Sequence, residues 1–170
     1  MSEVMEFEAD QNDQENEVQE MGSLNHSFVQ ARLTTLLSGD DRFTTMVELS
    51  LDASQIDLSQ FGLKVKDELK PDVCIYPKGR FGVRRLDLLR VPEMPLLAIE
   101  IISPKQGIND ILTKFEGYFA LGVKSCWLVM PAIQSITVYS QTSHKTFADD
   151  GEVVDKVLDI RLPLQKVFTE

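Results

Sequence analysis

The sequence predicts an α/β fold, in the form of an α+β mixed sheet whose central strand is covered on both faces. Residues 96–102 are all apolar except Glu100, and an apolar run without alternation is typical of a strand covered on both faces. A helical pattern at 108–121 and a second apolar run at 124–130 follow it. This order predicts two parallel strands joined by a right-handed crossover.

The composition indicates one globular domain. The chain has 170 residues, of which 43% are hydrophobic and 26% charged, enough for one sizeable core. We find no secretory leader, and no apolar run approaches the roughly 20 residues of a membrane helix. Cys74 and Cys126 each lie in an apolar run, so we expect small core residues and no disulfide. These features predict a cytoplasmic protein that does not enter a membrane.

The net charge of −10 is concentrated at the N-terminus. Residues 1–20 hold eight acidic residues and no Lys or Arg, so we expect 1–22 to be an acidic, disordered tail and 23–170 to be a single domain. Residues 64–90 contain eight basic and four acidic residues, a local net charge of +4. A basic segment near a site suits a phosphate-rich substrate, and an ordinary solvated surface is the alternative explanation.

Before the central run, the first expected element is a helix. Ser23 is expected to cap its start, and Gly39 is expected to end it. His26 falls in the first turn of this helix, where we interpret it as a surface histidine. The alternating segments 43–51 and 63–68 predict strands.

After the central run, Asn109 and Asp110 are expected to cap a helix that Gly122 ends. Its buried side is expected to contain Ile108, Leu112, Phe115 and Phe119. The remaining chain predicts a meander of antiparallel edge strands and a short closing helix, at 136–140, 145–148, 153–158 and 162–168.

Glu100 needs a compensating partner, because an ionised carboxylate is costly to bury unless it is paired, hydrogen-bonded or bound to a cation. Pro71 and Asp72 open a short buried strand at 73–76. If that strand pairs with the central one, both carboxylates can lie at one end of the sheet. Such hard oxygen ligands select Mg²⁺ or Mn²⁺, and the Ile101 carbonyl could complete the set. A Glu100 side chain that reaches solvent or a nearby lysine is the alternative.

Lys114 departs from the apolar positions of the helix and can therefore face the two carboxylates. A lysine ammonium next to a phosphate would orient an attacking water and neutralise developing charge. Glu48, in the expected strand 43–51, is an outside candidate for a further ligand.

These residues, in order, resemble the putative restriction endonuclease family of the PD-(D/E)xK type. The resemblance rests on Pro71–Asp72, Glu100, Ser103–Pro104, Lys114, Tyr118 and Trp127. It runs from about Ser23 to the C-terminus. It implies a restriction-endonuclease-like core with helices on both sides of the sheet, a Mg²⁺-dependent nuclease acting on DNA, and often a homodimer. It also implies that Asp72 and Glu100 are metal ligands and that Lys114 is a catalytic lysine that has moved from the strand to the following helix.

Two positions depart from the family pattern. Ile102 stands where the superfamily has a strand lysine, so catalysis would depend on Lys114, with Lys105 beyond the strand end as a fallback. Met130, directly before Pro131, stands at a position where the family commonly has an acidic residue. We expect that second change to affect a turn or an outer contact of the site.

The sequence therefore predicts a metal-dependent DNA endonuclease that hydrolyses phosphodiester bonds. A nuclease-fold module that binds DNA or a protein without turnover is the alternative, favoured by the acidic balance and the missing strand lysine. A purely structural domain would require Glu100 to be satisfied by hydrogen bonds or a basic side chain.

Overall fold

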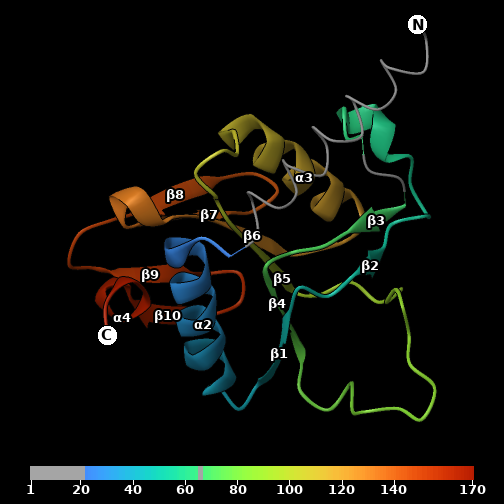
Figure 1. The fold of residues 1–170 in the computed structure, drawn as a ribbon, viewed down its shortest axis with the longest axis horizontal. Coiled ribbons are helices and arrows are strands. Elements are labelled where there is room, and N and C mark those ends of the chain that lie inside the picture. The colour runs from blue at the N-terminus through green and yellow to red at the C-terminus, as the bar shows by residue number, and fades with distance from the viewer. Residues whose placement is uncertain (1–21, 65–66) are drawn as a thin grey trace, which may run out of the picture.

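The computed structural model describes residues 22–64 and 67–170 (Figure 1). The expected acidic tail lies outside the described residues, apart from Gly22, and so do two residues of the expected strand 63–68. No helix of the described chain has both the length and the apolar character needed to cross a membrane.

A six-stranded mixed sheet forms the centre of the fold, in the order β1-β4-β5-β6-β7-β8. Its strands are β1 (Phe43–Val47), β4 (Val73–Pro77), β5 (Leu97–Ile101), β6 (Ser125–Met130), β7 (Ser135–Tyr139) and β8 (His144–Phe147). Only β5 and β6 run parallel, and every other neighbouring pair of this sheet is antiparallel. The predicted parallel pair around the central run is therefore confirmed.

Helices cover both faces of this sheet, as predicted (Figure 1). On one face, α2 (Leu24–Ser38) and α4 (Leu164–Phe168) pack in an apolar core with Ile99, Trp127 and Val129 of the central strands. On the other face, α3 (Ile108–Ala120) and the 3₁₀ helix η1 (Leu58–Phe61) share a second core with Ala98 and Leu128. Alternate residues of β5 and β6 thus enter opposite cores, which explains why these strands are apolar throughout.

Two short sheets lie beside the central one and correct the expected strands. The expected strand 43–51 is broken, because Glu48 adopts a positive φ of 51° and the chain resumes only as β2 (Leu51–Asp52). β2 pairs with β3 (Glu68–Leu69). The expected meander is also wrong at its end: β9 (Glu152–Asp155) leaves the sheet and pairs with β10 (Ile160–Pro163), a strand that we did not predict.

Two details of α3 differ from expectation. The helix begins after Gly107, which has no side chain to cap it, so the predicted capping by Asn109 or Asp110 is wrong. Its buried residues are Ile111, Phe115, Gly117 and Tyr118, whereas Ile108 is 42% exposed. The buried face is therefore rotated relative to the predicted one, and Gly122 follows the helix with the positive φ expected of a terminating glycine.

Candidate active site

Glu100 is the fourth residue of β5 and is buried, with only 3% of its surface exposed. Its side chain lies on the α3 face of the sheet, where the Tyr118 hydroxyl donates a 2.8 Å hydrogen bond to its Oε1. Lys114, one helical turn before Tyr118, places its Nζ 3.9 Å from the same oxygen. The buried carboxylate thus has a neutral and a cationic partner, both from α3.

Burial dominates the electrostatics of Glu100. Loss of solvation raises the pKa of its carboxyl and outweighs the opposing charge of Lys114. The charge of Asp72 also raises this pKa, the Tyr118 hydrogen bond and His26 lower it, and the net result is a pKa of about 7. Lys114 alone therefore does not offset the cost of ionising Glu100. A carboxyl held in this state has a strong electrostatic preference for an additional positive charge.

Asp72 immediately precedes β4 and is joined to β5 by its backbone and its side chain. Its N–H donates to the Ile99 carbonyl at 3.0 Å, and its Oδ2 accepts a 2.7 Å hydrogen bond from the Ile101 N–H. Asp72 therefore lies beside the residue that follows Glu100, at the same end of the sheet. The structure brings together the two carboxylates that the sequence singled out, because β4 and β5 are antiparallel neighbours.

The Ile101 carbonyl leaves β5 on the Asp72 side. In a strand the N–H and C=O of one residue point the same way, and the Ile101 N–H is bound to Asp72. The next residue, Ile102, donates instead to Val129 of β6. The carbonyl named from the sequence is thus directed toward the carboxylate end of the sheet.

The donor set fits a hard divalent cation. Asp72, Glu100 and the Ile101 carbonyl offer only oxygen ligands, and Mg²⁺ or Mn²⁺ commonly takes one or two carboxylates and completes its coordination with water and substrate oxygens. Within residues 22–64 and 67–170 there is no group of three or more His, Cys, Asp or Glu side chains arranged to hold a metal. The residues present therefore fit an open site that uses few protein ligands.

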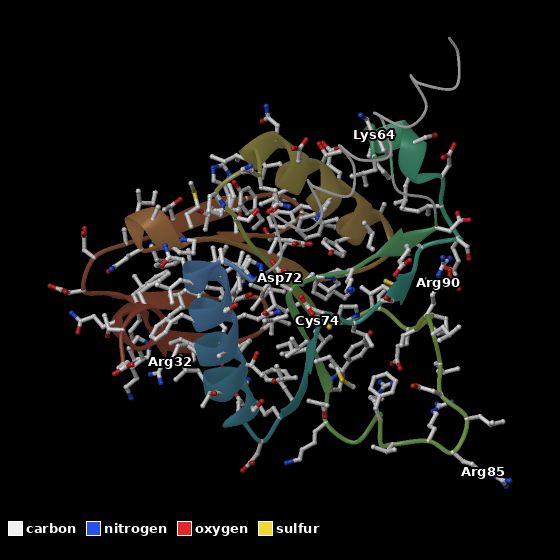
Figure 2. The ribbon with its side chains drawn as sticks, viewed as in Figure 1. Arg32, Lys64, Asp72, Cys74, Arg85 and Arg90 are labelled. Atoms are coloured by element: carbon white, nitrogen blue, oxygen red, sulfur yellow. The ribbon has the colours of Figure 1, made fainter. Side chains whose placement is uncertain are left out.

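Other candidates lie at the margin. Glu48 is exposed, and its backbone N–H donates to the Asp72 carbonyl at 3.2 Å. Lys105 is exposed in the turn after β5. The arginines of the loop 79–90 lie outside the carboxylate site, because this loop follows Pro77 and the five residues of β4 extend about 17 Å. Figure 2 shows Asp72 in the middle of the molecule and Arg85 at the outer edge of that loop.

Comparison with known proteins identifies the family. The sequence model of the putative restriction endonuclease family, Uma2, matches residues 11–165. The chain belongs to this family. The match begins at residue 11, inside the acidic segment that the sequence analysis left outside the resemblance. No curated protein matches the chain.

A solved structure agrees with this family assignment at the level of fold. The crystal structure of a putative nuclease belonging to DUF820 from Anabaena variabilis matches with a TM-score of 0.69 over 87% of this chain and 82% of that chain. The two sequences are 19% identical, so this likeness shows a shared nuclease fold. Both the predicted family and the predicted fold class are confirmed.

In this member of the Uma2 family, α2 contributes a residue that the sequence pattern led us to interpret as a surface histidine. His26 Nε2 lies 3.1 Å from Asp72 Oδ1, and only 13% of the His26 side chain is exposed. The hydrogen bond to Asp72 raises the pKa of His26, against the effect of burial. Gln30, one turn later, donates a 2.9 Å hydrogen bond to the Asp72 carbonyl. His26 therefore belongs to the site.

One signal in the sequence could have revealed this role. His26 precedes Val29 by three positions and Leu33 by seven, so helical periodicity puts it on the buried stripe of α2. A polar residue on that stripe needs a partner inside the protein, and here the partner is Asp72.

Proposed function

We propose that this protein is a metal-dependent endonuclease that hydrolyses phosphodiester bonds in DNA. The family supports a nuclease, and the convergence of Asp72, Glu100 and Lys114 supports this chemistry for this chain. A buried carboxylate whose pKa is raised to about 7, beside a second carboxylate, is an arrangement that a divalent cation would stabilise.

In this proposal Asp72, Glu100 and the Ile101 carbonyl hold Mg²⁺ or Mn²⁺. The bound cation would supply a Lewis acid for the phosphodiester group and the attacking water. Tyr118 fixes the orientation of the Glu100 carboxylate through Oε1, and the Ile101 N–H fixes that of Asp72 through Oδ2. These contacts hold both carboxylates in place before substrate arrives.

Lys114 is the proposed cationic partner of the reacting phosphate. Its side chain is only 25% exposed and its ammonium shares the Glu100 edge of the site, so it can orient water and neutralise charge on the phosphate. Water forms a bond to phosphorus and the bond from phosphorus to the 3′ oxygen breaks. The proton from water ends on that oxygen, which leaves a 5′-phosphate and a 3′-hydroxyl.

Cleavage of DNA by purified variants tests this function. With Mg²⁺ or Mn²⁺ the wild-type protein should cut DNA and EDTA should stop it. The variants Asp72→Asn, Glu100→Gln and Lys114→Ala should each lose about 100-fold or more of the rate while remaining folded. Glu116→Gln and Lys124→Ala, at exposed positions, are matched controls that should keep full activity. Retained cleavage in all three site variants would refute the proposal.

A nuclease-fold module without turnover is the second candidate. The net charge of −10 and Ile102 at the strand-lysine position favour it. Mn²⁺ titration by calorimetry separates the two: the nuclease should bind Mn²⁺ and lose that binding in Glu100→Gln, whereas an inert DNA- or protein-binding module need not bind it.

We further propose a homodimer of single-domain chains, each with residues 23–170 as one unit. The loop 79–90 supports it, because Leu86 and Leu89 are 81% and 90% exposed and Val83 is fully exposed. Exposed aliphatic residues grouped in one segment usually mark an interaction surface, and arginine is enriched at such surfaces.

We also infer a cytoplasmic location, which the two buried free cysteines support.

A further inference from the structure

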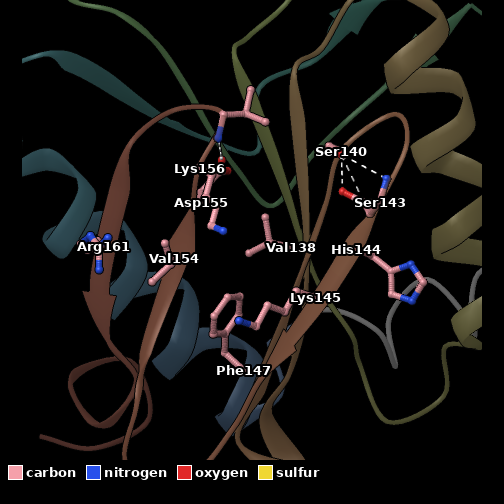
Figure 3. Close-up of a pocket in the computed structure, with 11 residues that line it drawn as sticks. Val138, Ser140, Ser143, His144, Lys145, Phe147, Val154, Asp155, Lys156 and Arg161 are labelled. Atoms are coloured by element: carbon pink, nitrogen blue, oxygen red, sulfur yellow. Dashed lines mark hydrogen bonds between the residues drawn. The ribbon is translucent and has the colours of Figure 1, made fainter.

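A cavity lies between the β7–β8 hairpin and the β9–β10 hairpin. It has a volume of about 520 Å³, within the range of small-molecule sites. Figure 3 shows Lys145 and Phe147 of β8 on one side and Val154 and Arg161 on the other. None of the residues lining this cavity belongs to the carboxylate site.

The cavity and the carboxylate site are on opposite faces of the central sheet. Glu100 is on the α3 face, where Tyr118 binds it. Val138 and Phe147, which line the cavity, pack against the core that contains α2 and α4. Three strand spacings also separate β5 from β8, about 14 Å. A ligand in the cavity would therefore not touch the proposed metal ligands.

The charged residues around the cavity are mainly cationic. Lys145, Lys156 and Arg161 line it. Arg161 has a 3.8 Å contact with Glu152, and both side chains are more than half exposed, so this pair leaves the guanidinium available. In the described part of the chain, neither lysine forms an ion pair with a carboxylate. Lys145 instead holds its ammonium 5.3 Å from the centre of the Phe147 ring.

The carboxylate that lines the cavity is already saturated. Asp155 is fully buried and accepts hydrogen bonds from Ser125, Trp127 and the N–H groups of Val157 and Leu158. These donors offset its negative charge within the protein. The cavity therefore favours an anion.

The uncharged part of the lining is mainly apolar and aromatic, with Ser140 and Ser143 as its polar members. Val138, Val154 and Phe147 provide a surface for an uncharged, planar group. The His144 ring does not add to it, because that ring stacks on Tyr139 at 5.1 Å and points away from the cavity (Figure 3). An inorganic anion would leave this surface unused, and a neutral apolar ligand would leave three cations unused.

We propose that this cavity binds a nucleoside phosphate, with the phosphate against Lys145, Lys156 and Arg161 and the base against the apolar surface to which Phe147 contributes. The ligand can be a free nucleotide or the phosphorylated end of a DNA strand, which share this chemistry. The proposal does not depend on the nuclease activity.

Tryptophan fluorescence provides a direct test. Trp127 is the single tryptophan, and its Nε1 donates a 2.9 Å hydrogen bond to Asp155, which lines the cavity. Thymidine 5′-monophosphate is titrated into the full-length protein in EDTA, so that the carboxylate site is not loaded. We expect saturable binding with a Kd of about 0.1 mM. Thymidine and inorganic phosphate should each bind about tenfold or more weakly.

Variants connect this binding to the cavity. Lys145→Ala with Lys156→Ala should weaken binding about tenfold or more, and Phe147→Leu should weaken it less. Lys124→Ala, an exposed lysine elsewhere, is the control that should change nothing. Circular dichroism checks folding, and Lys156→Glu alone is the second variant if the double variant misfolds.

Short oligothymidylates with and without a 5′-phosphate identify the source of the ligand. Tighter binding of the phosphorylated strand than of the mononucleotide would assign the site to DNA ends, and the reverse would assign it to free nucleotides. Absence of mononucleotide binding at about 5 mM would overturn the proposal. The proposal would also be overturned if the two lysine substitutions left binding unchanged, or if thymidine bound as tightly as thymidine 5′-monophosphate.

Discussion

At the scale of single residues, Glu100 determines how stability depends on pH. Burial raises its pKa to about 7 in the folded protein, above the ordinary value of 4.5. For an acid raised in this way, the folded state holds a proton that the unfolded state has lost between these two pH values. Its contribution to stability is thus complete below pH 4.5 and is lost as the pH rises through about 7.

The variant Glu100→Gln should remove this dependence. Glutamine cannot ionise and can still accept the Tyr118 hydrogen bond, so at pH 8 the variant should be more stable than wild type, by on the order of 3 kcal/mol. Near pH 4.5 the two should be similar in stability. Urea denaturation in EDTA across this pH range measures the difference. A difference that stays constant with pH would mean that Glu100 is not held protonated by burial.

At the scale of elements, α2 holds one edge of the candidate site. His26 and Gln30, one turn apart, bind the side chain and the carbonyl of Asp72, while Val29 and Leu33 anchor the same stripe in the core. The apolar packing of the helix therefore sets the position of the carboxylate. The sequence pattern contained this stripe, but it did not show that β4 would pass beneath it.

The variant His26→Ala should be destabilised, and more so at low pH. The pKa of His26 is raised in the folded protein by its hydrogen bond to Asp72. Its contribution is thus complete below its unfolded pKa of about 6.5 and is lost as the pH rises through the raised folded value. We expect a loss of about 1–2 kcal/mol at pH 6 and a smaller loss at pH 9, measured by thermal denaturation in EDTA.

His144→Ala is the matched control, since the chain contains two histidines and His144 is exposed and stacks on Tyr139. Its destabilisation should not follow the same pH dependence. Equal losses for His26→Ala at both pH values would show that the histidine does not interact with Asp72 as a cation.

At the scale of the whole molecule, the sheet keeps three surfaces apart. The carboxylates lie at one end of β4 and β5, the basic and aliphatic loop 79–90 leaves β4 at the other end, and the cationic cavity lies beside β8. The positive charge of the loop 79–90 therefore does not gather around the carboxylates as the sequence suggested. The exposed aliphatic residues of the loop are the basis for the proposed interface with a second copy of the chain.

The double variant Leu86→Asp with Leu89→Asp should be monomeric if the loop forms the dimer. Two carboxylates in an apolar interface should raise the dimer dissociation constant about 100-fold or more, as measured by sedimentation equilibrium. Leu24→Asp, which changes another exposed leucine at the start of α2, should leave the assembly unchanged. A wild-type protein that is monomeric at high concentration, or a double variant that still dimerises, would contradict the proposed interface.

The sequence by itself determined the central pair of strands, the helix between them, and Glu100 as a charge in need of a partner. Those results follow from local patterns: a strand buried on both faces must be apolar throughout, and one carboxylate in it is conspicuous. The sequence also predicted that Lys114 faces the site. That prediction was based on the wrong buried face of the helix, because the face that is buried in the structure contains Ile111, Phe115 and Tyr118.

Only the tertiary structure decided which groups surround Asp72 and Glu100. The break at Glu48, the pairing of β9 with β10 and the contact of His26 with Asp72 all depend on where distant segments meet. Periodicity shows that a face is buried, but it does not show what that face is buried against. His26 and Asp72 are far apart in sequence, and only the packing of α2 on the sheet brings them together.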